Sequence, residues 1–222
     1  MRILVINPVG HSTWNEADKA LYERFLPLDI EVDVMSLPRG PPTVETVEAY
    51  LEASRLVVEV GRTVVSKYNG IIINCFLDPG VEELRRETKS IVLGTGESSL
   101  TLANLYGRPI YVLTVSLSKE TLDLMRNKIH RFNLGEYLVG IVSVPIRVTD
   151  IDKDRNRASE LLLNTMKIIL SKESRAVFVL GCTGFGGMAE ELEDEIKIPV
   201  VDPVKASALL ITSLLKLTKH HI

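Results

Sequence analysis

The chain has 222 residues, of which 45% are apolar and 25% are charged, and its formal net charge at pH 7 is −3. This is the balance of an ordinary globular protein, and the lack of a Lys/Arg block argues against nucleic-acid binding. No apolar run approaches the roughly 18 residues needed to cross a bilayer, so the sequence also argues against a membrane span.

The first residues, 1–7, predict a strand and not a signal peptide, because the apolar stretch is short and no small-residue cleavage site follows. We therefore expect a cytoplasmic protein. The chain contains no Gln and is rich in Glu and Lys, which is a tendency of hyperthermophile proteins. Its two cysteines, Cys75 and Cys182, do not make a secreted disulfide framework.

Short apolar runs alternate with helical spacing along the first half of the chain. We expect strands at residues 2–6, 30–35, 71–74 and 91–93. We expect helices at residues 14–25 and 44–67. A further helix should open at Asp78-Pro79, since Asp caps free N–H groups and Pro suits the first helical turn.

The same alternation begins again after Gly94-Thr95-Gly96. We expect strands at residues 109–115, 137–142, 176–180 and 200–201. We expect helices at residues 98–106, 119–132, 150–170, 187–196 and 203–217, two of them capped by Ser118 and Asp202. Strict alternation of strands and helices predicts parallel sheets with helices on both faces.

The two cysteines occupy corresponding places in the two halves. Cys75 and Cys182 each close a buried strand and precede a turn and a helix start. The pattern predicts an α/β fold with two pseudo-symmetric lobes, each a parallel sheet flanked by helices, and an active site in the cleft between them. Lobe 1 would comprise residues 1–96 plus 205–222, and lobe 2 residues 97–204.

Thiols at the carboxyl ends of parallel strands lie where open α/β sheets bind ligands. Two such groups on opposite faces of a substrate could remove and return a proton beside a carbonyl, which inverts the stereocentre. A helix N-terminus would lower the thiol pKa, and the N–H groups after each cysteine would bind the enolate oxygen. The plainer interpretation is that each cysteine is a core residue. A structural disulfide is disfavoured because we expect a cytoplasmic chain, and a metal site is less favoured still because no Cys-x-x-Cys or His cluster accompanies the cysteines.

Several segments carry a resemblance to a known family. They are Ile6-Asn7-Pro8, Asn74-Cys75-Phe76-Leu77-Asp78-Pro79-Gly80, Gly94-Thr95-Gly96-Glu97, Leu180-Gly181-Cys182-Thr183-Gly184 and Ile198-Pro199-Val200-Val201-Asp202-Pro203. In these residues the chain resembles the aspartate/glutamate/hydantoin racemase superfamily, and most closely its hydantoin and allantoin racemase branch.

The resemblance implies two pseudo-symmetric α/β lobes and racemisation by two bases, with no cofactor and no metal. It implies a small-molecule substrate and a homo-oligomer. Cys75 and Cys182 would be the proton donor and acceptor. The substrate ring would be held by side chains and main chain of Asn7, Phe76, Thr114, Thr183 and Gly184.

The chain departs from the superfamily's amino-acid racemases at two places. Phe76-Leu77 stands where those enzymes have Asn-Thr, and Gly184 stands where they often carry Glu or His. These departures favour a neutral or weakly acidic ring, such as a 5-substituted hydantoin or allantoin. Alternatives are an aspartate- or glutamate-type racemase, a decarboxylase or isomerase of the same superfamily, and a thiol redox or ligand-binding protein without turnover.

Overall fold

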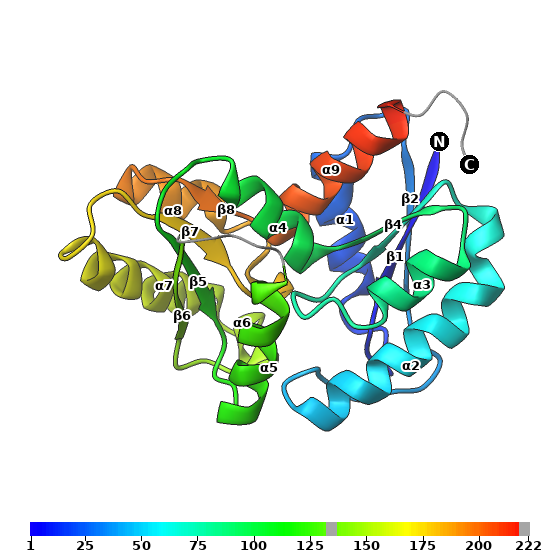
Figure 1. Ribbon diagram of the computed structural model, residues 1–222, viewed down its shortest axis with the longest axis horizontal. Helices are drawn as coiled ribbons and strands as arrows, with labels where there is room; N and C mark the ends of the chain where they lie inside the picture. The colour runs from blue at the N-terminus through cyan, green and yellow to red at the C-terminus, as the bar shows by residue number, and fades with distance from the viewer. Residues whose placement is uncertain (132–136, 218–222) are drawn as a thin grey trace.

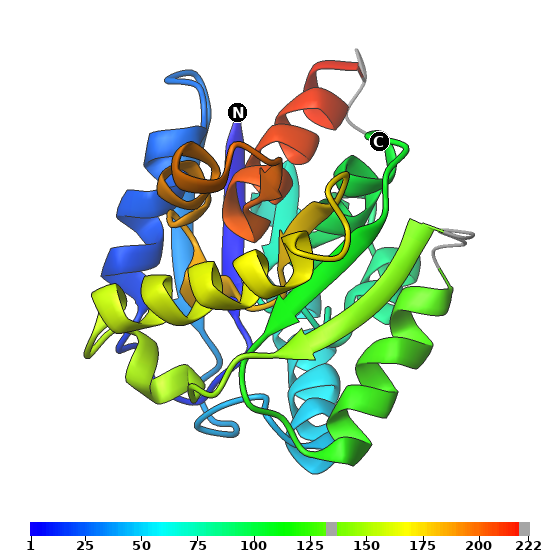
Figure 2. The same ribbon diagram turned by 90° about the vertical axis from the view of Figure 1, so that its left-hand side faces the viewer.

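The computed structural model describes residues 1–131 and 137–217 (Figure 1). It contains two four-stranded sheets, one from each half of the chain, and every strand pairing is parallel. Helices flank both sheets, which lie side by side in Figure 1 and are seen from the side of the second sheet in Figure 2. The predicted fold class, α/β with two parallel sheets, is confirmed.

The first sheet has the strand order β2-β1-β3-β4. Its strands are β1 (Arg2–Asn7), β2 (Glu31–Ser36), β3 (Gly70–Ile73) and β4 (Ile91–Gly94). Its connecting helices are α1 (Asn15–Phe25), α2 (Val47–Val64) and α3 (Val81–Glu87), with a 3-10 turn, η1 (Val65–Lys67), after α2.

The second sheet has the order β6-β5-β7-β8, which repeats the topology of the first. Its strands are β5 (Ile110–Thr114), β6 (Leu138–Ser143), β7 (Val177–Leu180) and β8 (Val200–Val201). The helices of this half are α4 (Thr95–Asn104), α5 (Lys119–His130), α6 (Val148–Ile151), α7 (Arg155–Leu170) and α8 (Ala189–Ile196), with a 3-10 turn, η3 (Thr183–Phe185), before α8.

Alternate residues of the central strands enter different cores, as the period of two in a strand requires. In β3, Ile72 joins the core under α1 and α9, whereas Ile71 and Ile73 join the core under α2 and α3. In β7, Phe178 packs toward α7 and α8, and Val179 toward α4 and α5. Burial on both faces explains why these strands are continuous apolar runs without alternation.

The last helix, α9 (Pro203–Leu217), leaves the second sheet and packs against α1, α4, β3 and β4. Asp202 caps it, since its carboxylate accepts hydrogen bonds from the N–H groups of Val204 and Lys205 at 2.9 and 3.1 Å. These contacts support the lobe boundaries near residues 95–98 and 202–206, which stay a prediction. Residues 218–222, and the predicted helix end at Phe132, lie outside the described residues.

Two predicted helices of the second half differ from the structure. Helix α4 begins at Thr95 and not at 98, because Glu97 and Asp78 satisfy the free N–H groups of its first turn. The helix predicted at 150–170 is two helices, α6 and α7. Asp154 interrupts it by accepting a hydrogen bond from the N–H of Arg157, which makes Asp154 the N-cap of α7.

Candidate active site

One cavity of about 620 Å³ opens where the carboxyl ends of strands from both sheets meet. Its walls include every residue that the sequence predicted for the site: Asn7, Cys75, Phe76, Thr114, Cys182, Thr183 and Gly184. A volume of this size is typical of small-molecule sites. The fold therefore brings together residues that lie up to 177 positions apart, from 7 to 184.

The two cysteines occupy equivalent positions in the two sheets. Cys75 lies two residues after the end of β3, and Cys182 lies two residues after the end of β7. The neighbouring central strands end at Asn7 in β1 and at Thr114 in β5. The pairings Ile6↔Ile73 and Leu113↔Leu180 show that both ends stand in the same register, so the pseudo-symmetry extends to the cavity.

A hydrogen bond joins the two cysteine segments across the cavity. The Thr183 hydroxyl donates to the Asn74 carbonyl at 3.3 Å, which links the residue after one cysteine to the residue before the other. Thr114 supports the second segment, since its buried hydroxyl donates to the carbonyl of Gly181 at 3.1 Å. The two thiols are also close enough that a charge on Cys182 raises the pKa of Cys75.

Both thiols are held in the same local geometry. The main-chain N–H of Leu77 lowers the pKa of the Cys75 thiol, and the N–H groups of Gly184 and Phe185 lower that of Cys182. In each case one of these N–H groups belongs to the residue two positions after the cysteine. These N–H groups favour the thiolate form of each sulfur.

Burial nevertheless outweighs those hydrogen bonds and raises the pKa of both thiols to about 12. Nearby carboxylates add to the increase in pKa, Asp78 for Cys75 and Glu45 with Asp152 for Cys182. The expectation that a helix N-terminus would lower the thiol pKa was wrong. The reason is that a turn, and not a long helix, directly follows each cysteine, while burial disfavours the charged thiolate.

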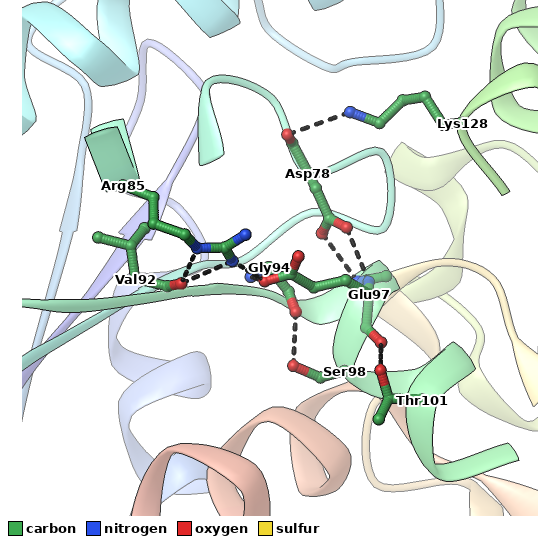
Figure 3. Close-up of polar contacts among 9 residues, drawn as sticks. Asp78, Arg85, Val92, Gly94, Glu97, Ser98, Thr101 and Lys128 are labelled. Carbon is green, nitrogen blue, oxygen red and sulfur yellow. Dashed lines mark hydrogen bonds and ion pairs between the residues drawn. The ribbon is translucent and has the colours of Figure 1, made fainter. Parts of the chain in front are cut away.

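The loop that carries Cys75 is fastened to the N-terminus of α4 (Figure 3). The two Asp78 carboxylate oxygens accept hydrogen bonds from the N–H groups of Gly96 and Glu97 at 2.8 and 2.7 Å. Asp78 is buried and has a φ of 49°. Asp78 was predicted to cap its own helix, and this was wrong. Helix α3 begins only at Val81, after a left-handed Gly80, and the Asp78 side chain turns to α4 instead.

A lysine from the second half holds the same loop. Lys128 of α5 donates to the Asp78 carbonyl at 3.4 Å and to the Tyr50 hydroxyl at 2.9 Å. Close packing leaves no space beside the loop, because a Cβ placed on Gly96 would lie 2.0 Å from the Phe76 carbonyl oxygen. The position of Cys75 is therefore fixed by contacts from both halves of the protein.

We expect Asp78→Ala to lower the free energy of unfolding by about 2 kcal/mol, because two buried hydrogen bonds from main-chain N–H groups are lost. Burial raises the pKa of Asp78 to about 7, above its ordinary 3.8. The folded state thus favours the protonated carboxyl, and the stability from Asp78 is greatest below pH 3.8 and declines as the pH rises through 7. Urea unfolding at pH 5 and pH 8 should show the larger loss at pH 5. A larger loss at pH 8 would contradict this.

The first-half wall of the cavity holds a chain of side-chain hydrogen bonds. The buried Tyr22 hydroxyl donates to Asn74 Oδ1 at 3.1 Å, and Asn74 Nδ2 donates to Asn7 Oδ1 at 2.8 Å. Asn7 Nδ2 in turn donates to Asn15 Oδ1 at 3.0 Å and to Asp18 Oδ2 at 2.8 Å. Asn7 therefore lines the cavity with both amide hydrogens already bonded to protein.

Charged residues of the cavity were missed by the sequence reasoning. They are Asp18, Arg24, Glu45, Asp152 and Arg155. In the sequence these residues look like the solvated charges of helix faces and loops, and no motif separates them from such charges.

The opposite wall of the cavity is apolar. Val44, Leu117, Met125 and Val148 line it, together with Leu77 of the Cys75 loop. The loop carrying Val44 is held across the cleft by its neighbour Glu45. The Glu45 carbonyl accepts from the Thr121 hydroxyl at 3.0 Å, and its carboxylate accepts from the N–H of Val148 at 3.2 Å.

In the two stretches that the structure describes, 1–131 and 137–217, no group of three or more His, Cys, Asp or Glu residues is arranged to hold a metal ion. Within the same stretches, none of the helices combines the length and the apolar character needed to cross a membrane.

Comparison with known proteins places these features in a family. The family model described as Asp/Glu/Hydantoin racemase matches residues 3–211. A hydantoin racemase of Pseudomonas sp. (strain NS671) is 25% identical over 220 residues, which cover 99% of this chain and 88% of that protein. A hydantoin racemase of Paenarthrobacter aurescens is 26% identical over 219 residues, covering 98% of this chain and 92% of that protein.

A solved structure supports the same grouping at the level of the fold. The allantoin racemase from Klebsiella pneumoniae superimposes with a TM-score of 0.90 at 24% identity, covering 98% of this chain and 88% of that one. The match of the family model extends over nearly the whole chain, including both cysteine segments. The chain therefore belongs to the Asp/Glu/Hydantoin racemase family.

Proposed function

We propose that the protein is a cofactor-independent racemase of 5-substituted hydantoins or of a related ureido ring such as allantoin, with Cys75 and Cys182 as its two bases. The observation that carries the proposal is the pair of thiols at equivalent strand ends of two sheets, in the walls of one cavity. The similarity to hydantoin racemases over 98–99% of the chain supports the choice of substrate.

The proton transfer needs one thiolate and one thiol. The thiolate takes the proton from C5 of the ring, and the electron pair of that C–H bond moves to the adjacent carbonyl oxygen, forming an enolate. The other thiol then gives its proton to C5 from the opposite face and becomes the thiolate. The roles of Cys75 and Cys182 are therefore exchanged after each turnover, and the reverse reaction starts from that state.

The raised pKa of the thiols suits a weak carbon acid. A thiolate whose conjugate acid has a pKa of about 12 is a stronger base toward C5 than an exposed thiolate would be. Little thiolate is present at neutral pH, so each thiolate is a strong base but only a small fraction of the enzyme carries one. The N–H groups directed at each sulfur stabilise the thiolate when it forms.

The charges of the cavity favour a ring over an amino acid. Three carboxylates line it, and both of its arginines are engaged: Arg24 with Glu190, and Arg155 with Asp152 at 3.5 Å. Arg155 also donates to main-chain carbonyls of the Cys182 segment. The α-carboxylate of aspartate or glutamate would enter a cavity that is already negative, whereas a neutral ureido ring would not be repelled.

The test follows the optical rotation of one enantiomer of 5-benzylhydantoin, and of L-aspartate in parallel, with pure protein. We expect the hydantoin rotation to decay to zero and the aspartate rotation to persist. Decay with aspartate alone would replace this proposal by an amino-acid racemase. Loss of carbon dioxide from an arylmalonate, without racemisation of the hydantoin, would favour a decarboxylase. The expectations of a homo-oligomer, a cytoplasmic location and a hyperthermophile source stay predictions.

A further inference from the structure

In the hydrogen-bond chain of the first-half wall, each residue donates to the next one, and the chain ends at a carboxylate. Tyr22 donates to Asn74, Asn74 donates to Asn7, and Asn7 donates to Asp18. The side-chain oxygens of Asn74 and Asn7 already accept hydrogen bonds within this chain, and these bonds fix the orientation of both amides. The carboxylate of Asp18, on α1, is the last group, since it accepts a hydrogen bond and donates none.

Asn7 is consequently a poor donor to any ligand. Its Nδ2 carries two hydrogens, and these are bonded to Asn15 and Asp18. An ionised carboxylate has about four acceptor sites. The Asn7 side chain donates to Asp18 at 2.8 Å, so acceptor capacity is left on a carboxylate that lines the cavity.

We propose that Asp18 is the substrate-recognition residue of this wall and that its carboxylate accepts a hydrogen bond from a ring N–H of the ureido substrate. The inference rests on the proposed function and names the residue that recognises the substrate ring. A hydantoin ring has two N–H donors and two carbonyls, so its binding requires protein acceptors as well as donors. The main chain after each cysteine supplies N–H donors, and Asp18 supplies the acceptor.

The charged groups around Asp18 leave it free for this role. Arg24 lies on the same helix but pairs with Glu190, and Arg155 of α7 pairs with Asp152. Asp152, from the loop between α6 and α7, faces Asp18 and repels it. No ion pair between Asp18 and either arginine is formed within the described residues. An N–H of the ligand would give this carboxylate a second donor beside the Asn7 amide.

The affinity for the ring should then depend on the protonation state of Asp18. Burial, with a smaller contribution from the charge of Asp152, raises the pKa of Asp18 to about 6. Above pH 6 the ionised carboxylate accepts from the ring N–H, and below pH 6 it is protonated and accepts less well. The affinity for the ring should therefore fall as the pH is lowered from 7 to 5.

The experiment uses 5-benzyl-5-methylhydantoin, which has no C5 proton and so binds without turnover. Its Kd is measured by calorimetry from pH 5 to pH 8 with the wild type and with Asp18→Asn. The variant keeps an oxygen for Asn7 and presents an NH₂ group to the ring. We expect its Kd to be about tenfold higher or more at pH 8 and nearly independent of pH.

Asp152→Asn is the matched control, because Asp152 lines the same cavity and pairs with an arginine. It should keep the pH dependence of Kd, with the midpoint shifted to lower pH since one repelling charge is gone. A second measurement is independent of any folding defect in a variant: the wild type should bind one of the two N-methylated analogues about tenfold more weakly or worse.

Three outcomes would overturn the inference. The first is a Kd of Asp18→Asn equal to that of the wild type at pH 8. The second is a pH dependence of Kd that survives in Asp18→Asn, and the third is equal binding of the parent ring and both N-methylated analogues. If the wild type neither racemises nor binds a hydantoin, both the proposed function and this inference are contradicted. An active wild type with any of the three outcomes overturns the role of Asp18 alone.

Discussion

Replacing either thiol by a hydroxyl should nearly abolish racemisation. We expect Cys75→Ser and Cys182→Ser each to lower kcat for 5-benzylhydantoin about 10³-fold, within the range known for loss of a general acid or base. Serine fills nearly the same space, but its hydroxyl is a much weaker acid than a thiol and is not a base at neutral pH. Because each turnover uses both groups, neither variant should keep substantial activity in either direction.

The two variants also separate the proposed racemase from its alternatives. If one of them keeps most of its activity, a single thiol suffices, as in a decarboxylase or isomerase that protonates an enolate. If both keep their activity, the thiols are not the bases. The control is the thermal unfolding midpoint, which should change little, because each cysteine lines the cavity and serine can still accept the N–H bond of Leu77 or Gly184.

The second large effect is a steep rise of activity with pH. Both thiols have a pKa raised to about 12, so the fraction of enzyme with one thiolate should grow about tenfold per pH unit below that value. We expect kcat/KM, which reports on the free enzyme, to rise about 100-fold from pH 7 to pH 9 without a plateau. Circular dichroism at each pH controls for alkaline unfolding.

A plateau of kcat/KM below pH 8 would contradict this expectation. It would mean that one thiol is ionised at neutral pH, as the sequence suggested from the turn and helix that follow each cysteine. The structure favours the opposite because the desolvation of each sulfur exceeds the stabilisation by the neighbouring N–H groups. The slope of the profile therefore distinguishes local electrostatics from burial at the two thiols.

Much of the fold could be predicted because its signals are local. Fully buried strands such as Gly70–Ile73 and Val177–Leu180 are apolar runs between turn residues, and Ser118 marks a helix start by its own side chain. The matched placement of Cys75 and Cys182 indicated one shared site, and both line the cavity.

The errors arose where a distant side chain decides the local structure. The sequence near Thr95 looks like a loop because of its glycines, yet it is helical because Asp78, 17 positions earlier, caps it. Asp18 could not be singled out either. Its carboxylate looks like part of a solvated helix face until the fold places Asn7 beside it. Thiol pKa values depend on burial, which local sequence does not report.

The most direct test of two thiols acting from opposite faces is the distribution of label in heavy water. One enantiomer of 5-benzylhydantoin is incubated with the wild type in heavy water. At low conversion the two enantiomers are separated, and the deuterium content of each is measured by mass spectrometry. We predict that the newly formed enantiomer carries deuterium at C5 while the recovered starting enantiomer carries almost none. Equal labelling of both enantiomers, or labelling that persists when both cysteines are replaced by alanine, would contradict a two-thiol mechanism.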